Sequence, residues 1–268
     1  MSFAETTKNG VTVTYSQGIA GAGGAVHAFS TRLGGVSAGI YASLNLGSTR
    51  DDPDCVRENY RRFFQAAGAD LTQVAMSNQV HGDVVRPVTS ADRKRDLYDP
   101  EGYEADGLVT DLPGVSLVIF GADCLPILLY DPVRRVAAAC HAGWRGTALG
   151  IAQRAVEKMG FYGSRPEDIR AAIGPGIAKC CFETHEDVPN AMTKALGVCA
   201  TPYIEPIEGG KFKVDLKGLN ARRLKRAGLL EEHIDISPDC TACHPEKYWS
   251  HRATQGRRGS QAAVIQLL

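Results

Sequence analysis

The segment from Leu108 to Gly160 places the strongest constraint on the fold, because short apolar runs are followed directly by a helical repeat. The apolar runs are bounded by turn residues and cover 108–109, 115–120, 127–130 and 136–140. Short runs of this kind are typical of buried strands. Apolar residues then recur at helical spacing from Leu149 to Met159 and stop at Gly160. The segment therefore predicts several buried strands followed by a packed helix.

The alternation of strands and helices continues along the chain. Asp52 and Pro53 are typical of a helix start, and the apolar face that follows them ends at Gly68. We interpret the glycine-rich stretch Gly18 to Gly24 as a turn. Further patterns predict helices over 186–196 and 216–229, and strands over 74–80, 169–173 and 262–267. This order predicts a mixed sheet in one α/β or α+β domain over residues 1–268.

The charge balance excludes some classes of partner. The 30 Lys and Arg residues cancel the 30 Asp and Glu residues, so the net charge is zero with seven histidines neutral. General nucleic-acid binders and membrane-surface proteins usually carry a basic excess, so we expect neither partner. The apolar run Val115–Tyr130 is interrupted by Asp123 and is shorter than the ~20 residues that span a bilayer. Since the first ten residues do not resemble a signal peptide, we expect a cytoplasmic protein.

Two motif matches are interpreted as coincidences. The G-x-S-x-G pattern around Ser37 resembles a hydrolase nucleophile elbow, but no helical repeat follows it. The sequence Cys240-Thr-Ala-Cys243-His244 matches a haem attachment pattern or half of a zinc ribbon. A ribbon needs a second C-x-x-C, and the adjacent Cys180 and Cys181 have the wrong spacing for one.

Three potential metal ligands each follow or end an apolar run. His81 follows residues 74–80, Cys124 lies between two runs, and His141 ends the run 136–140. One thiolate and two imidazoles suit Zn²⁺ and leave a fourth position for water, as in catalytic zinc sites. The spacing alone favours unrelated core residues over a shared metal site.

Six segments together resemble the bacterial laccase-domain family, also called the multicopper polyphenol oxidase-like or peptidoglycan editing factor family. The segments are 29–37, 78–82, 105–109, 121–126, 141–146 and 173–177, and residues 1–24 match weakly. The resemblance implies that His81, Cys124 and His141 hold one zinc ion. It also implies a single α/β domain of stacked mixed sheets flanked by helices, similar to the catalytic domain of cytotoxic necrotizing factor.

The resemblance further implies a purine nucleoside phosphorylase that acts on adenosine, inosine, guanosine and methylthioadenosine, and that also deaminates adenosine. We expect Cys124 and His141 at the catalytic centre, with Asp123 or Asp106 as proton shuttle. Arginines suit a phosphate site, and Arg145 is the first candidate. Substrate contacts are expected from Arg32, Asn45 and Arg252. Towards the C-terminus, Ser250, Arg252 and Arg257 occupy the places of the corresponding family residues.

Other functions remain open at this stage. Cys124 could be the nucleophile of an amidohydrolase acting on peptidoglycan precursors, with His141 as its base. A copper-dependent polyphenol oxidase and a non-enzymatic metal-binding protein are further alternatives. The same ligands can also bind Cu²⁺ in vitro. The sequence predicts no oligomeric state.

Overall fold

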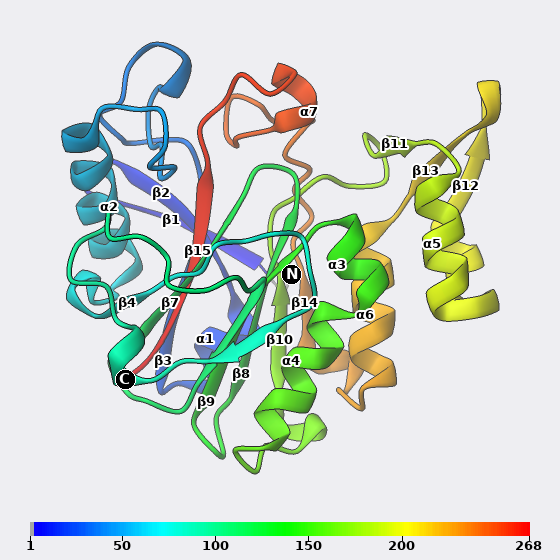
Figure 1. Ribbon diagram of the computed structural model, residues 1–268, viewed down its shortest axis with the longest axis horizontal. Helices are drawn as coiled ribbons and strands as arrows, with labels where there is room; N and C mark the ends of the chain where they lie inside the picture. Colours follow the sequence, from blue (N-terminus) through cyan, green and yellow to red (C-terminus); the bar gives the residue numbers. More distant parts are fainter. Residues whose placement is uncertain (1–2) are drawn as a thin grey trace.

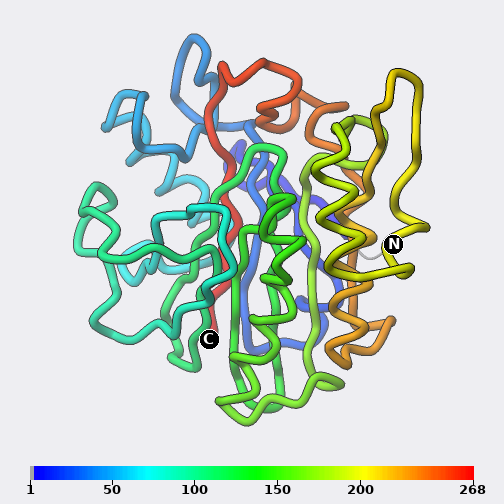
Figure 2. The backbone as a smooth tube through the Cα atoms, turned by 45° about the vertical axis from the view of Figure 1, so that its right-hand side comes forward, coloured from blue at the N-terminus to red at the C-terminus, as the bar shows by residue number. Residues whose placement is uncertain are grey.

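Two six-stranded sheets form the centre of the protein, whose computed structural model describes residues 3–268. In the first sheet all neighbouring strands are antiparallel except β4 and β7. Its strands, in spatial order, are β1 (Phe3–Lys8), β2 (Val11–Ser16), β3 (Ala25–Ser30), β15 (Gln261–Leu267), β7 (Ser116–Gly121) and β4 (Val74–Ala75). The C-terminal strand β15 thus lies inside the sheet, between the N-terminal strands and β7 (Figure 2).

The second sheet contains most of the strands predicted in the middle of the sequence. Its strands, in spatial order, are β14 (Ile234–Ile236), β10 (Arg170–Ile173), β8 (Leu125–Asp131), β9 (Val136–Ala142), β6 (Gly107–Thr110) and β5 (Val85–Pro87). β10 with β14 and β5 with β6 pair in parallel, whereas the other neighbours are antiparallel. The predicted mixed sheet is confirmed.

The two sheets pack face to face and are covered by helices on their outer faces (Figure 1). Phe29, Ile119 and Ile265 of the first sheet share one apolar cluster with Leu128 and Ala139 of the second. Helix α2 (Pro53–Ala67) covers the first sheet. The second sheet is covered by α3 (Trp144–Leu149), α4 (Ile151–Gly160) and α6 (Leu216–Arg226), and α5 (Asp187–Leu196) packs against α3. The predicted α/β class with stacked, helix-flanked sheets is therefore confirmed.

A small third sheet and two short helices complete the fold. The third sheet has the order β11 (Glu183–Thr184), β13 (Lys211–Val214) and β12 (Ile204–Ile207). The short helices are α1 (Gln17–Ala22) and α7 (His251–Thr254). The third sheet lies beside α5, at the end of the molecule away from α2 (Figure 1).

Local sequence signals account for the helix boundaries. The Asp52 side chain accepts hydrogen bonds from the backbone N–H groups of Asp54 and Cys55, and α2 ends at Gly68 as predicted. The helix predicted after His141 forms, but it is broken into α3 and α4 at Gly150. Gly150 has a φ of 88°, a left-handed conformation that glycine adopts without strain.

Two local predictions are wrong. The stretch Gly18 to Gly24 was expected to be a turn, but most of it belongs to α1. Ser16 caps this helix by accepting a hydrogen bond from the N–H of Ile19, and its hydroxyl donates to Asp235. The strand expected over 74–80 is only the two-residue β4, because the chain then leaves the sheet and forms a single bridge from Asn78 to Glu104.

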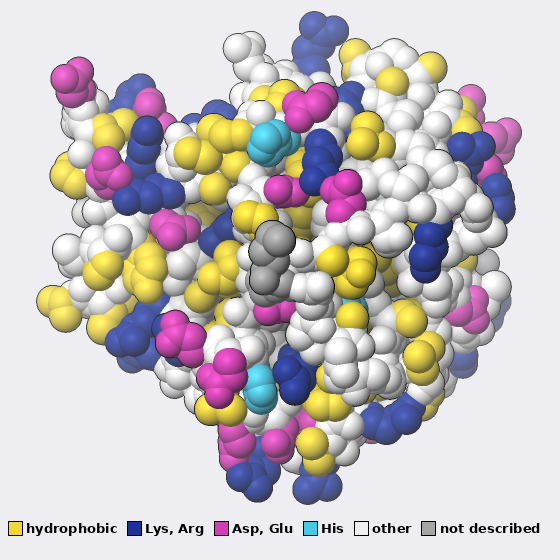
Figure 3. Space-filling view, turned by 180° about the vertical axis from the view of Figure 1, so that it is seen from behind, with side chains coloured by type: hydrophobic (Ala, Val, Ile, Leu, Met, Phe, Trp, Pro, Cys, Tyr) yellow, Lys and Arg dark blue, Asp and Glu magenta, His cyan; other side chains and the backbone are white. Residues whose placement is uncertain are grey.

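The surface mixes charges of both signs. Basic and acidic side chains are interspersed over the face seen from behind (Figure 3), in line with the zero net charge. Within residues 3–268, every helix is too short or too polar to cross a membrane.

Candidate functional site

The three predicted metal ligands come from separate elements and meet at one end of the sheets. Cys124 lies in the connection that carries the chain from β7 in the first sheet to β8 in the second. His141 belongs to β9 and pairs with Pro126, and His81 lies in the loop after β4 with a φ of 62°. One ligand atom from each residue lies within 4.8 Å of the others. The structure thus brings together the side chains expected to form the metal site.

Asp106 fixes two of these ligands. Its buried carboxylate accepts hydrogen bonds from the backbone N–H groups of Val80 (3.1 Å), His81 (3.0 Å) and Gly82 (2.7 Å). It also lies 2.8 Å from Nδ1 of His141. Burial raises the pKa of Asp106, but these hydrogen bonds outweigh it and keep the pKa below its usual value. Since Asp106 occupies Nδ1, the Nε2 atom of His141 is left for a metal.

The thiol of Cys124 is activated by its neighbours. Burial alone would raise its pKa, but hydrogen bonds and charge from His141 and His81 lower the pKa of Cys124 to about 6. Burial lowers the pKa of His141, whereas Asp106 and Cys124 raise it, with a net result of about 9. A thiolate is therefore favoured at neutral pH, which suits both metal binding and nucleophilic chemistry.

Gly143 permits the close approach of the ligands. A Cβ atom at this position would lie 3.0 Å from the sulfur of Cys124 and 3.2 Å from Cδ2 of His81. These distances are tighter than ordinary carbon contacts, so any larger residue would push the two ligands apart.

A cavity of about 340 Å³ opens beside the ligands. Its walls combine apolar side chains with two arginines and two of the ligands. They are formed by His81, Ala122, Asp123, Cys124, Gly143, Trp144, Ile177, Phe182, Leu216, His251, Arg252 and Arg258. A largely apolar pocket with a few converging polar groups is typical of a small-molecule site.

A second hollow of about 300 Å³ adjoins the cavity, and the two share His251 and Arg258. Asn45, Arg50 and Ser260 are among its lining residues. Asn45 is buried, and its side chain is bonded to Gly47, Asp51 and Ser260. Asn45 therefore shapes the second hollow and does not border the cavity beside the metal ligands.

Arg258 is a candidate substrate residue that the sequence analysis did not identify. Its guanidinium donates to the carbonyl of Gly259 (2.9 Å) and to Oγ of Ser260 (3.0 Å), while its Nε is buried without a partner in the described chain. Burial lowers the pKa of Arg258, although the negative charges of Asp123 and Cys124 oppose this effect. Arg257 occupies the place of the family arginine in the sequence, but Arg258 is the arginine that borders the cavity.

Asp123, expected as a proton shuttle, has both carboxylate oxygens occupied. One oxygen accepts a hydrogen bond from the hydroxyl of Thr241 (2.7 Å), and the other from the backbone N–H of Arg252 (2.6 Å). The carboxylate therefore holds the C-terminal segment against the end of the sheets.

The expected arginines lie in three different environments. Arg252 borders the cavity, and its guanidinium donates to the carbonyls of Cys181 and Glu183, each at 3.0 Å. Arg32 donates to the carbonyls of Ala42 and Pro245 and stacks on Trp249, so its side chain is used within the fold. Arg145 is exposed, stacks on Trp144 and does not border the cavity.

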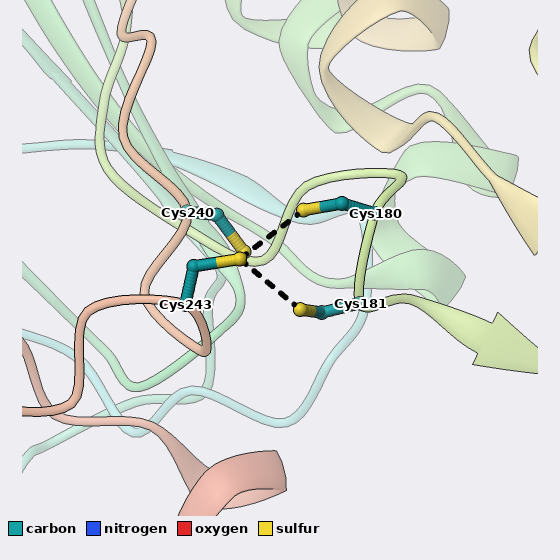
Figure 4. A group of neighbouring side chains, drawn as sticks. All are labelled: Cys180, Cys181, Cys240 and Cys243. Carbon is teal, nitrogen blue, oxygen red and sulfur yellow. Dashed lines mark hydrogen bonds between the residues drawn. The ribbon is translucent and has the colours of Figure 1, made fainter.

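A second group of potential metal ligands corrects the interpretation of the cysteine motif as a coincidence. Cys180, Cys181, Cys240 and Cys243 lie together, with their sulfur atoms within 4.8 Å of one another (Figure 4). The spacing of these cysteines along the sequence did not indicate the group, because the adjacent pair Cys180 and Cys181 lies in a different loop from Cys240 and Cys243.

The fold and site define a mixed α/β protein with potential histidine and cysteine ligands for a metal in the wall of a small-molecule cavity. The chain belongs to the family described as multi-copper polyphenol oxidoreductase laccase, whose sequence model matches residues 26–268. The resemblance seen in the sequence is therefore confirmed.

Relatives and solved structures agree with this assignment. The chain is 42% identical to a purine nucleoside phosphorylase of Deinococcus radiodurans, over 90% of this chain and 88% of that protein. It is 36% identical to the purine nucleoside phosphorylase YlmD of Geobacillus stearothermophilus, over 90% of both chains. The crystal structure of a Bacillus licheniformis protein titled hypothetical protein YfiH superposes with a TM-score of 0.90, at 32% identity over 97% of both chains. The names of these relatives support an enzyme.

Proposed function

We propose that the whole chain is one catalytic domain, a zinc-dependent purine nucleoside phosphorylase that also deaminates adenosine. The observation that carries this proposal is that the ligand group His81, Cys124 and His141 meets one cavity, whose wall contains His81, Cys124, Arg252 and Arg258. The substrates would be adenosine, inosine, guanosine or methylthioadenosine, with phosphate. Since these are small molecules, a few arginines in one cavity are sufficient and no basic surface is needed.

The ligand set fits zinc. Two imidazoles and a thiolate are borderline ligands that Zn²⁺ prefers, and three protein ligands leave one position open. When bound, Zn²⁺ would act as a Lewis acid and would lower the pKa of a bound water towards ~7. Cu²⁺ can occupy the same ligands in vitro.

The cavity walls divide into an apolar part and a cationic part. Trp144, Ile177, Phe182 and Leu216 are the apolar wall residues, and we assign the purine base to them. Arg252 and Arg258 supply guanidinium groups suited to phosphate and to the ribose hydroxyls. We infer that the guanidinium of Arg258, which borders the cavity, donates to phosphate.

Phosphorolysis forms a bond between an oxygen of hydrogen phosphate and C1′ while the bond from C1′ to the base breaks, and the proton that the phosphate loses ends on the departing purine. Positive charge develops on the ribose in this step, and the two arginines hold the phosphate dianion beside it. Asp123 fixes the backbone of Arg252 and the hydroxyl of Thr241, so we assign it to positioning. In deamination, a water oxygen replaces the amine at C6 of adenosine, and ammonia leaves.

The decisive experiment incubates the zinc-loaded protein with inosine plus phosphate, and separately with adenosine. We expect hypoxanthine with ribose 1-phosphate from the first mixture and inosine from the second. Arg258→Gln should raise the KM for phosphate more than it lowers the rate of deamination, because deamination needs no phosphate. Absence of both products with fully zinc-loaded protein would contradict the proposal.

A second candidate function is favoured by the low pKa of Cys124, about 6, together with its contact to His141. A cysteine amidohydrolase acting on peptidoglycan precursors would use this thiolate as nucleophile. Such an enzyme would keep its activity after exhaustive chelation, whereas the zinc enzyme would lose it. We place either activity in the cytoplasm, where cysteines stay reduced.

A further inference from the structure

The four-cysteine group, Cys180, Cys181, Cys240 and Cys243, lies outside the cavity and is not used by the proposed reaction. All four cysteines are free, and their side chains converge from two loops (Figure 4). The sulfur of Cys243 lies 3.4 Å from that of Cys180 and 3.3 Å from that of Cys181.

The sheet topology explains why these loops meet. β10 and β14 are parallel neighbours, with Ile173 opposite Ile236, so the chain leaves both strands at the same edge of the second sheet. A bridge between Gly176 and Cys240 continues this pairing beyond the strands. The cysteines therefore lie together because of the fold, although more than fifty residues separate the two pairs in the sequence.

We propose that the four-cysteine group binds one Zn²⁺ as a closed structural site. Four thiolates at Zn–S distances of about 2.3 Å would place their sulfurs roughly 3.8 Å apart, because the geometry is tetrahedral. The observed sulfurs lie within 4.8 Å of one another, with the shortest separations near 3.3 Å, so small side-chain adjustments would reach this geometry. An iron–sulfur cube would need wider spacing, since several atoms would separate the thiolates.

Hydrogen-bond donors and one cation lie near Cys240 and favour negative charge on its sulfur. The backbone N–H of Ala178 donates to the sulfur of Cys240 at 3.3 Å. Lys217 is buried nearby, where its ammonium group donates to the carbonyls of Ser237 (2.7 Å) and Asp239 (2.6 Å). Four thiolates and one Zn²⁺ carry two net negative charges, which these donors and the Lys217 cation partly neutralise.

The proposed zinc would join two segments that form part of the cavity wall. Cys181 precedes Phe182, a wall residue, and its carbonyl accepts a hydrogen bond from Arg252. Thr241 lies between Cys240 and Cys243 and donates to Asp123. The metal would thus hold the wall in place through backbone and side-chain bonds without contacting the substrate.

Zinc content of the purified chain under reducing conditions tests this inference independently of the proposed function. We expect that Cys124→Ala retains one zinc per chain and that Cys124→Ala combined with Cys243→Ser retains none. Cys55→Ser is the matched control and should leave the zinc content unchanged. If the catalytic site failed to bind zinc, the wild type would hold one zinc that Cys124→Ala keeps.

Thiol reactivity provides a second measurement that does not depend on a folded variant. Cys180 and Cys243 are exposed, so free thiols at these positions would react rapidly with an alkylating reagent. We expect slow alkylation of both in the zinc-loaded wild type and rapid alkylation after strong chelation. Rapid alkylation without chelation, a disulfide involving Cys243, iron in place of zinc, or an unchanged zinc content in Cys243→Ser would overturn the proposal.

Discussion

The two groups of potential metal ligands differ in number, in the elements that carry them and in what lies beside them. The first group offers two histidines and Cys124 at the ends of packed strands, next to a cavity. The four-cysteine group belongs to two loops and brings four sulfurs within 4.8 Å of one another. Three protein ligands beside a cavity leave one coordination position for water or substrate, which is typical of a catalytic metal site. Four converging thiolates leave no free position, which is typical of a structural metal site.

The largest effect should come from Cys124→Ala, which removes the thiolate from the first group and leaves the second intact. We expect a loss in kcat/KM of roughly 1,000-fold or more, since a bound metal contributes several kcal/mol to transition-state stabilisation. Steady-state phosphorolysis of inosine measures this. If Cys124→Ala kept activity near the wild-type level, the first ligand group would not be the catalytic one.

Asp106→Asn should have the next largest effect, because Asp106 orients His141 and the loop that carries His81. A partner of a metal ligand typically contributes 10–100-fold in metal affinity or activity, and we expect a change of about that size. Competition with a chromogenic chelator measures the affinity. Within residues 3–268, no hydrogen bond links Asp106 to the four-cysteine group, so the zinc proposed there should be retained at the same chelator concentration.

Gly143→Ala should change the positions of the ligands in the first group without removing any of them. The added methyl group would contact the sulfur of Cys124 and the ring of His81. We expect roughly tenfold weaker metal binding at the first group, or about 1.4 kcal/mol. Gly160→Ala is the matched control, since a Cβ atom there meets nothing within 4 Å. Equal affinities in the two variants would contradict the tight fit.

The smallest effect on activity should follow Cys243→Ser, because the four-cysteine group acts only through the cavity wall. We expect about a fivefold rise in the KM for the nucleoside, equivalent to about 1 kcal/mol, with little change in kcat. The melting temperature should fall in the same variant, since a structural zinc contributes to folding. A large fall in kcat at unchanged KM would assign the four-cysteine group to the reaction itself.

The sequence predicted those elements of the fold whose determinants lie within a few neighbouring residues. The apolar runs of β7, β8 and β9 and the capping of α2 are encoded within a few neighbouring residues, so the sequence predicted them. Helix α1 was missed because Ser16 and Gly18 bond to Asp235, more than 200 residues away. No pattern within the glycine-rich segment indicates that contact.

Only part of the candidate site could be predicted from the sequence. His81, Cys124 and His141 were singled out by their positions beside apolar runs, and the motif resemblance then implied that they hold zinc. Asp106 was named only as a possible proton shuttle. Arg258 was missed because a shift of one residue separates it from the arginine aligned with the family pattern. The four-cysteine group was missed because its assembly depends on the parallel pairing of β10 and β14, which spacing rules for a single hairpin do not describe.

The position of Cys124 between β7 and β8 has a thermodynamic consequence. These strands belong to different sheets, so a metal bound to Cys124, His81 and His141 is bound to the connection between the two halves of the sandwich. Binding free energies are reciprocal, so a metal that prefers one arrangement of the sheets must itself be bound more tightly when that arrangement is stabilised. Core substitutions far from the site, at positions such as Ile119 or Leu128, would then alter metal affinity without touching a ligand.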